Sequence, residues 1–90
     1  MEGIDYSRLP VHIRDGMQRY IEQGIEPGSF LTAVLCNDLM GAVGKADEVN
    51  LPKLWQICSF LYNDAPSPSF GSVEAFRAWI DRGGLEGRRK

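Results

Sequence analysis

Apolar residues recur at the spacing of an α-helix in four segments of the sequence, and glycine or proline separates each segment from the next. Side chains three, four and seven positions apart lie on one face of a helix, so each segment predicts a helix that buries that face. No segment alternates apolar and polar residues as a half-buried strand does. We therefore expect an all-α protein, a single compact domain of four short helices. The clearest stripe consists of Leu51, Leu54, Trp55, Cys58, Leu61 and Tyr62.

The first helix is predicted over residues 10–23. Pro10 suits the first turn, because the N–H that proline lacks would have no partner inside the helix. Gly24 marks the end, since glycine readily adopts the left-handed conformation that closes many helices. Gly16 lies inside the helix, where glycine costs roughly 1 kcal/mol relative to alanine. Either the protein tolerates this cost, or another backbone or a ligand comes close to Gly16.

The second helix is predicted over residues 30–43, with Ser29 as its candidate N-cap. Its residues are apolar around most of the circumference, which is typical of the central helix of a bundle. Asp38 interrupts the apolar seam, where a carboxylate without a partner is costly. The structural interpretation is that Asp38 caps a helix or pairs inside the bundle with Arg14 or Arg77.

The third helix begins at Leu51-Pro52, with Asn50 as its candidate cap. Residues 65–69 contain two prolines, so they predict a stiff, extended connector before the last helix. Ser72 caps the fourth helix, which is predicted over residues 73–82 and ends at Gly83-Gly84. The expected layout is an N-terminal arm over residues 1–9, a helical domain over residues 10–84 and a basic, mobile tail over residues 85–90.

Charge is distributed unevenly along the chain. Residues 1–76 contain five basic and ten acidic side chains, a net charge of −5, whereas residues 77–90 contain five basic and two acidic ones, a net charge of +3. An acidic body disfavours the phosphate backbone of nucleic acids, which bound proteins neutralise with clustered Lys and Arg. Nucleic acid is therefore not the expected partner, and only the basic tail supports such a role.

The sequence predicts a protein of the cytoplasm. The first residues have neither the basic start nor the apolar stretch of a secretory signal, and no segment approaches the roughly 18 apolar residues of a membrane span. We therefore expect no membrane association. Cys36 and Cys58 lie in apolar helical patterns, which favours reduced thiols in the core over a disulfide.

Motifs for enzyme chemistry are weak. The segment 41–45 looks like part of a phosphate-binding loop, but it lacks an earlier glycine, a following Ser or Thr and a preceding strand. Asp47 and Glu48 are adjacent rather than spaced on a helical face, and His12 is the only histidine. We therefore expect no metal site, no cofactor and no catalytic residue, and classify the chain as a non-enzymatic protein.

Two groups of residues are candidates for binding. Polar side chains embedded among apolar ones could converge on a groove between helices, where bundle proteins place ligand sites. Apolar side chains off the main stripes could form a contact patch for a protein, including a second copy in a homo-oligomer. The first group contains Arg14, Asn37, Asp38, Tyr62, Asn63 and Ser72, and the second contains Ile57, Phe60 and Trp79.

Several short motifs suggest a source for the chain. They are the run Pro27-Gly28-Ser29-Phe30-Leu31-Thr32-Ala33-Val34-Leu35, then Asn37-Asp38-Leu39, Ala46-Asp47, Phe60-Leu61-Tyr62-Asn63, Ala65-Pro66 and Gly71-Ser72. In these motifs, over residues 10–84, the chain resembles small uncharacterised proteins of tailed bacteriophages and prophages. The resemblance implies an accessory protein in a bacterial host cell that acts by occupying a host or phage protein. By analogy alone, a self-associating interaction module is expected first, and a small polar-metabolite or nucleotide binder is the alternative.

Overall fold

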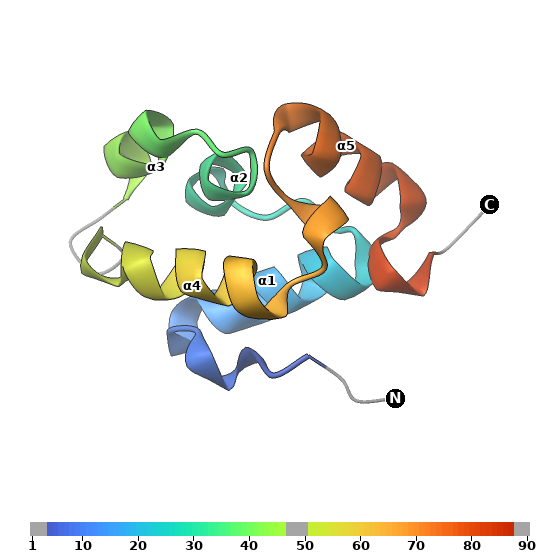
Figure 1. Cartoon of the computed structure of the whole chain (residues 1–90), viewed down its shortest axis with the longest axis horizontal. Helices are drawn as coiled ribbons and strands as arrows, with labels where there is room; N and C mark the ends of the chain where they lie inside the picture. Colours follow the sequence, from blue (N-terminus) through green and yellow to red (C-terminus); the bar gives the residue numbers. More distant parts are fainter. Residues whose placement is uncertain (1–3, 47–50, 88–90) are drawn as a thin grey trace.

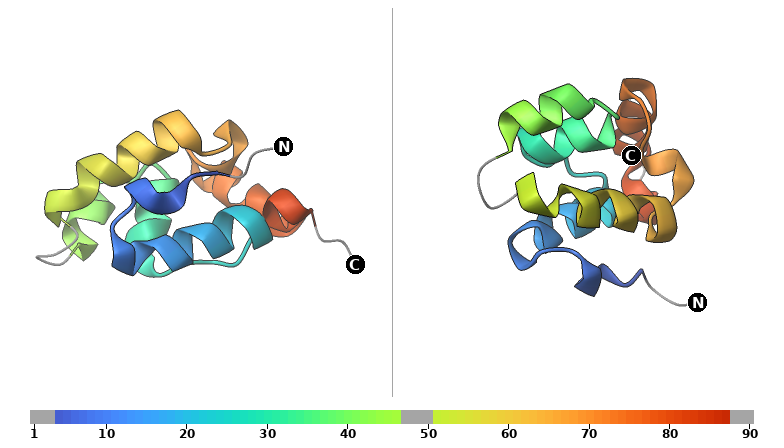
Figure 2. Two further views of the ribbon diagram at one scale, coloured as in Figure 1. Left: turned by 90° about the horizontal axis from the view of Figure 1, so that it is seen from below. Right: turned by 60° about the vertical axis from the view of Figure 1, so that its left-hand side comes forward.

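Five α-helices and four turns of 3-10 helix make up the protein in the computed structural model, which describes residues 4–46 and 51–87 (Figure 1). In these residues the chain forms no strand. Helices α2, α3 and α5 lie on one side of the pair formed by α1 and α4 (Figures 1 and 2). The elements are η1 (Tyr6–Arg8), α1 (Val11–Gln23), α2 (Ser29–Leu35), α3 (Leu39–Lys45), η2 (Leu51–Lys53), α4 (Leu54–Asp64), η3 (Ser67–Ser69), α5 (Val73–Arg82) and η4 (Gly84–Glu86).

The all-α fold class is confirmed, and the chain packs into one compact globule. Its radius of gyration is 12.2 Å, close to the value expected for a globular chain of this length. Among the described residues, no helix has both the length and the apolar character that crossing a membrane requires. Asn50, the expected cap of the third helix, and the last three residues of the basic tail lie outside the described residues.

The prediction of a single helix over residues 30–43 is wrong, because the chain forms two helices there, α2 and α3, with a break between them. At the break Asn37 has a φ of 63°, a left-handed conformation that asparagine tolerates better than most residues. Asp38 then caps α3, accepting a hydrogen bond from the Gly41 N–H at 3.0 Å. Asp38 is exposed rather than on a buried seam, so the carboxylate keeps its hydration and caps a helix at the same time.

The core fills the space between the two layers. Large apolar side chains from every α-helix except α3 meet there, and α3 contributes only Ala42. Full burial of such a side chain stabilises a fold by about 1.5–3 kcal/mol. The fully buried apolar side chains include Leu9, Met17, Tyr20, Ile21, Leu35, Ile57, Phe60, Phe76 and Trp79.

The end of α1 meets the end of α5 in a backbone contact that we call the C-terminal junction (Gly24, Trp79 and Gly84). Gly24 and Gly84 have φ values of 72° and 70°, and a Cβ on Gly84 would lie 2.6 Å from the Gly24 nitrogen. Trp79 donates its indole N–H to the carbonyl oxygens of Tyr20 and Ile21 at 3.2 and 3.1 Å. The bond to Ile21 satisfies a carbonyl in the last turn of α1, where carbonyls lack a partner inside the helix. The Tyr20 carbonyl also accepts a hydrogen bond from the Gly24 N–H at 2.9 Å. The predicted stops at Gly24 and Gly83 are confirmed, since both are left-handed C-caps.

The N-terminal segment lies across α1 and α4 (Figure 2). Arg14 of α1 donates three hydrogen bonds to carbonyl oxygens in this segment, at 2.8 to 3.1 Å. These bonds hold the segment down, so Tyr6 and Leu9 are buried and belong to the core. An N-terminal arm was expected over residues 1–9. The part of it that the structure describes contributes to the hydrophobic core.

The connector between α4 and α5 contains a turn of 3-10 helix, η3, whereas an extended segment was expected. Ala65 and Pro66 are extended, as residues next to proline prefer. Ser69 in η3 is buried, and its carbonyl accepts a hydrogen bond from the Tyr20 hydroxyl at 2.7 Å. Tyr20 also stacks on Phe76 with ring centroids 5.4 Å apart, so the turn is anchored to both α1 and α5.

Candidate functional site

The outward side of α4 carries two exposed aromatic side chains. Trp55 is 76% exposed and Tyr62 is 84% exposed. They are seven positions apart, close to two helical turns, so they project from the same side of α4. Two small residues, exposed Cys58 and half-buried Ser59, lie between them on that side. We call these four residues the α4 ridge: Trp55, Cys58, Ser59 and Tyr62.

A groove of about 310 Å³ runs along one side of the α4 ridge, and we call it the upper groove. None of the described side chains that line it is charged. The turn after η3 forms one end of the groove and is fixed there, because the Gly71 N–H donates to the Leu35 carbonyl at 2.8 Å. The lining residues are Val34, Asn37, Cys58, Leu61, Tyr62, Phe70 and Gly71.

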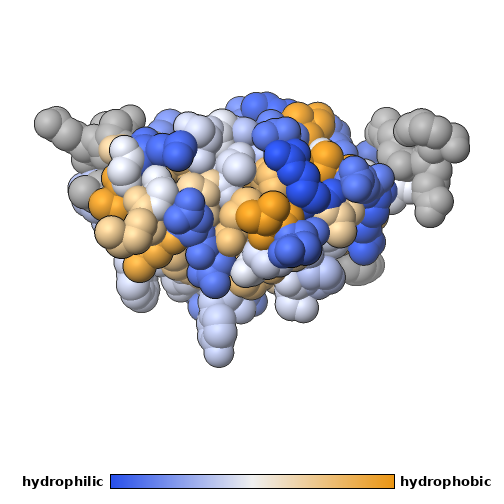
Figure 3. Space-filling view, turned by 90° about the horizontal axis from the view of Figure 1, so that it is seen from above, coloured by the Kyte–Doolittle hydropathy of each residue, from blue (hydrophilic) through white to orange (hydrophobic). Residues whose placement is uncertain are grey.

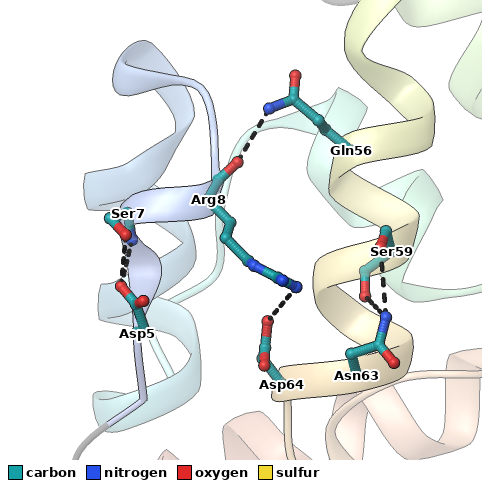
Figure 4. Close-up of polar contacts among 7 residues, drawn as sticks. All are labelled: Asp5, Ser7, Arg8, Gln56, Ser59, Asn63 and Asp64. Carbon is teal, nitrogen blue, oxygen red and sulfur yellow. Dashed lines mark hydrogen bonds and ion pairs between the residues drawn. The ribbon is translucent and has the colours of Figure 1, made fainter.

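A second groove of about 320 Å³, the lower groove, separates the α4 ridge from η1. Gln56 donates to the Arg8 carbonyl at 3.1 Å, and the Arg8 guanidinium lies 3.5 Å from the Asp64 carboxylate (Figure 4). These contacts tie η1 to α4 along the floor of the groove. Its lining residues are Ser7, Arg8, Trp55, Gln56, Ser59 and Phe60. The α4 ridge therefore stands between two grooves.

Apolar surface continues from α4 onto α3. A small hollow between the two helices is lined by Leu39, Leu54 and Cys58, among others, so Leu39 lies next to the α4 ridge. Met40 and Val43 are also exposed. Seen from the side of α3, α2 and α5, apolar atoms gather at the end of the molecule that α3 occupies (Figure 3). Helix α3 thus presents most of its apolar side chains to the outside.

A wider hollow, of about 640 Å³, lies between α1 and residues 25–31. Charged side chains of both signs line it, including Asp15, Arg19 and Glu26, and all three are exposed. Ligand sites are usually enclosed and apolar, with few polar groups. The upper groove matches that description better because its walls are mostly apolar and uncharged.

The contact patch expected at Ile57, Phe60 and Trp79 is wrong, because all three side chains are buried in the core. Helix α4 has apolar residues on two sides. The sequence stripe through Trp55, Cys58 and Tyr62 was expected to face inward, but Ile57 and Phe60 face inward instead. Ile57, Phe60 and Leu61 are also spaced as one face of a helix. This second pattern was the signal in the sequence that the other side of α4, the α4 ridge, could face outward.

The structure brings two of the polar candidates together. Asn37 and Tyr62 both line the upper groove, from the α2–α3 break and from α4. Ser72 is next to Gly71 in the sequence, but its hydroxyl accepts a hydrogen bond from the Ala75 N–H at 3.0 Å and caps α5, as predicted. Of the six predicted polar binding residues, only Asn37 and Tyr62 therefore place polar groups in this groove.

The remaining polar candidates serve local structure. Asn63 donates to the Ser59 carbonyl at 3.0 Å, one turn earlier in α4 (Figure 4). Arg14 holds the N-terminal segment, and Asp38 caps α3. Arg77, an expected partner of Asp38, instead lies 3.6 Å from the Glu26 carboxylate. The six predicted binding residues thus do not converge on one groove.

The two cysteines occupy different environments. Cys58 is exposed on the α4 ridge and Cys36 is half-buried, so the expectation of two core thiols is wrong for Cys58. Both thiols are free. Partial burial raises the pKa of each thiol above its ordinary value. Since the thiolate is the nucleophile, a raised pKa makes both side chains weak nucleophiles at neutral pH.

Residues 4–46 and 51–87 contain no cluster of three or more His, Cys, Asp or Glu side chains that could hold a metal ion. Comparisons of the chain with protein-family models, with curated proteins and with solved structures found no match.

Proposed function

We propose that this protein is a non-enzymatic protein-interaction module whose contact surface is the α4 ridge with the upper groove. The observation that supports this most strongly is the exposure of Trp55 and Tyr62, both above three quarters, on one side of one helix. Tryptophan and tyrosine dominate the energy of protein interfaces, because their rings bury a large area at little cost in conformational entropy. Two such side chains beside an uncharged groove form a surface suited to an apolar partner.

The chemistry of the groove supports a binding role rather than catalysis. The strongest nucleophile among its described lining residues is the thiol of Cys58, and burial raises the pKa of that thiol. In the part of the chain that the structure describes, no carboxylate or imidazole lines the upper groove to act as a general base. The resemblance to phage proteins makes a host or phage protein in the bacterial cytoplasm the proposed partner.

Affinity capture with matched baits tests this proposal. The baits are the full chain, a Trp55→Ala/Tyr62→Ala variant and a Val11→Ala control. Val11 is 75% exposed, as Trp55 is, but lies on α1. We expect a protein, or an untagged copy of the chain, to be captured by the first and third baits and lost from the second. Binding of the purified partner, measured by calorimetry, must show the same order.

The proposal is wrong if every captured protein, including an untagged copy of the chain, binds all three baits equally. The polar-metabolite alternative has less support, since the polar candidates do not converge. A thermal-shift screen addresses it directly, because a ligand at 100 times its dissociation constant stabilises the folded state by about 2.7 kcal/mol.

A further inference from the structure

We propose that the α4 ridge pairs with the α4 ridge of a second copy of this chain, with the two helices antiparallel. Trp55 of each copy then packs against Tyr62 of the other. This inference rests on the proposed function, because it names the partner of the same surface.

The spacing of the ridge residues is symmetric about its centre. Trp55 and Tyr62 are equally distant from the midpoint between Cys58 and Ser59. A two-fold axis at that midpoint, perpendicular to α4, places Trp55 level with Tyr62 of the copy and Cys58 level with Ser59 of the copy. Such an interface uses one patch on both subunits, so a patch must be complementary to itself. The α4 ridge meets this condition, with small residues at the centre and aromatic residues at both ends.

Charge favours a copy as the occupant. Residues near a two-fold axis lie beside their own counterparts, so a charged side chain there would face a like charge. Among the residues that the structure describes, the α4 ridge and the lining of the upper groove contain no charged side chain. In the lower groove, the guanidinium of Arg8 is paired with the Asp64 carboxylate. The net charge of the whole chain is only −2, so long-range repulsion between copies is weak.

The four aromatic side chains supply about half of the area that a specific dimer needs. At about 150–250 Å² per aromatic side chain, the exposed parts of the four aromatic residues in a dimer provide roughly 500–800 Å². Specific interfaces start at about 1,200 Å² in total. Cys58, Ser59 and the neighbouring Leu39 add to the aromatic contribution on each copy. The grooves on both sides of the ridge give the side chains of a facing helix room to interdigitate.

Sedimentation equilibrium of the full chain tests whether the dimer forms. We expect a monomer–dimer equilibrium, a dissociation constant raised about thirtyfold by Trp55→Ala or Tyr62→Ala, and no change for Val11→Ala. Circular dichroism of each variant checks that the fold is retained. A chain that stays monomeric at all accessible concentrations overturns the proposal, and so does a dimer that both aromatic variants leave unaffected.

Chemical cross-linking tests the register. A short bismaleimide joins two thiols that come close together, and the proposed axis brings the two Cys58 side chains near each other. We expect a covalent dimer from the Cys36→Ser variant, in which Cys58 is the only thiol, and none from Cys58→Ser, in which only Cys36 remains. A dimer in sedimentation that Cys58 does not cross-link contradicts the antiparallel pairing.

The two proposals can fail separately. If the chain is monomeric but capture of another protein depends on Trp55 and Tyr62, the α4 ridge is an interaction surface and the second copy is not its partner. If neither self-association nor capture depends on these side chains, both proposals fall.

Discussion

The two tryptophans of this protein are used in opposite ways. Trp79, in the C-terminal junction, is buried and donates its indole N–H to two backbone carbonyls of α1. Trp55, on the α4 ridge, is 76% exposed. Hydrogen bonds and close backbone contacts determine the junction, whereas the ridge presents apolar side chains to the outside. The difference indicates that the junction maintains the fold and that the ridge is available for an intermolecular role.

The largest expected effect is at the junction. In Gly84→Ala, the new Cβ would lie 2.6 Å from backbone atoms of α1, at a φ of 70° that alanine rarely adopts. The backbones would have to separate, so we expect a loss of about 3 kcal/mol or more in the free energy of unfolding, measured with urea. Gly28→Ala is the control, because its φ is −67° and nothing lies within 4 Å of the new Cβ. Equal stability of the two variants would contradict this account of the junction.

A pair of tyrosine variants gives a smaller effect. Tyr20→Phe removes a buried hydrogen bond to the Ser69 carbonyl, so we expect a loss of about 1–2 kcal/mol in thermal or urea unfolding. The hydroxyl of Tyr6 is also buried and lies near the Glu22 carboxylate, but the two make no hydrogen bond of good geometry. Tyr6→Phe should therefore cost less stability than Tyr20→Phe. The reverse order would show that the hydroxyl of Tyr20 does not anchor η3.

Gly16→Ala should stabilise the protein by about 0.5–1 kcal/mol, because alanine forms helices better than glycine. The new Cβ would lie 3.7 Å from the Leu31 side chain, an ordinary van der Waals contact. Gly16 is thus tolerated in α1 rather than required there, unlike the glycines of the junction. Urea unfolding measures the change, and a clear loss of stability would mean that α1 and α2 are packed too closely for a methyl group.

The smallest expected effect on stability is at the α4 ridge. Trp55→Ala and Tyr62→Ala remove side chains that are mostly exposed, so each should change the unfolding free energy of the monomer by about 0.5 kcal/mol or less. Measurement at a protein concentration well below the dissociation constant of any dimer isolates the monomer. If either variant lost as much unfolding free energy as Tyr20→Phe, the α4 ridge would have a structural role. It would then no longer differ from the C-terminal junction in this respect.

Local signals in the sequence predicted several features correctly. Gly24 and Gly83 end helices, and Ser72 caps α5, because these positions depend on neighbouring backbone groups alone. The break at Asn37 was missed, although Asn37 and Asp38 are residues that favour a left-handed turn and an N-cap. The apolar residues on both sides concealed it. Of the residues that line the upper groove, the sequence predicted Asn37 and Tyr62 as binding residues, and it predicted none of the apolar ones.

What the sequence determined by itself was the helical class and most of the helix ends, since helical periodicity and capping act over a few residues. Only the tertiary structure decided which side of α4 faces the core. Ile57 and Phe60 offer one apolar side and Trp55 and Tyr62 another, and the choice depends on which side fits against α1 and the N-terminal segment. The contact of Gly24 with Gly84 was decided in the same way, because close packing between residues sixty positions apart leaves no local pattern in the sequence.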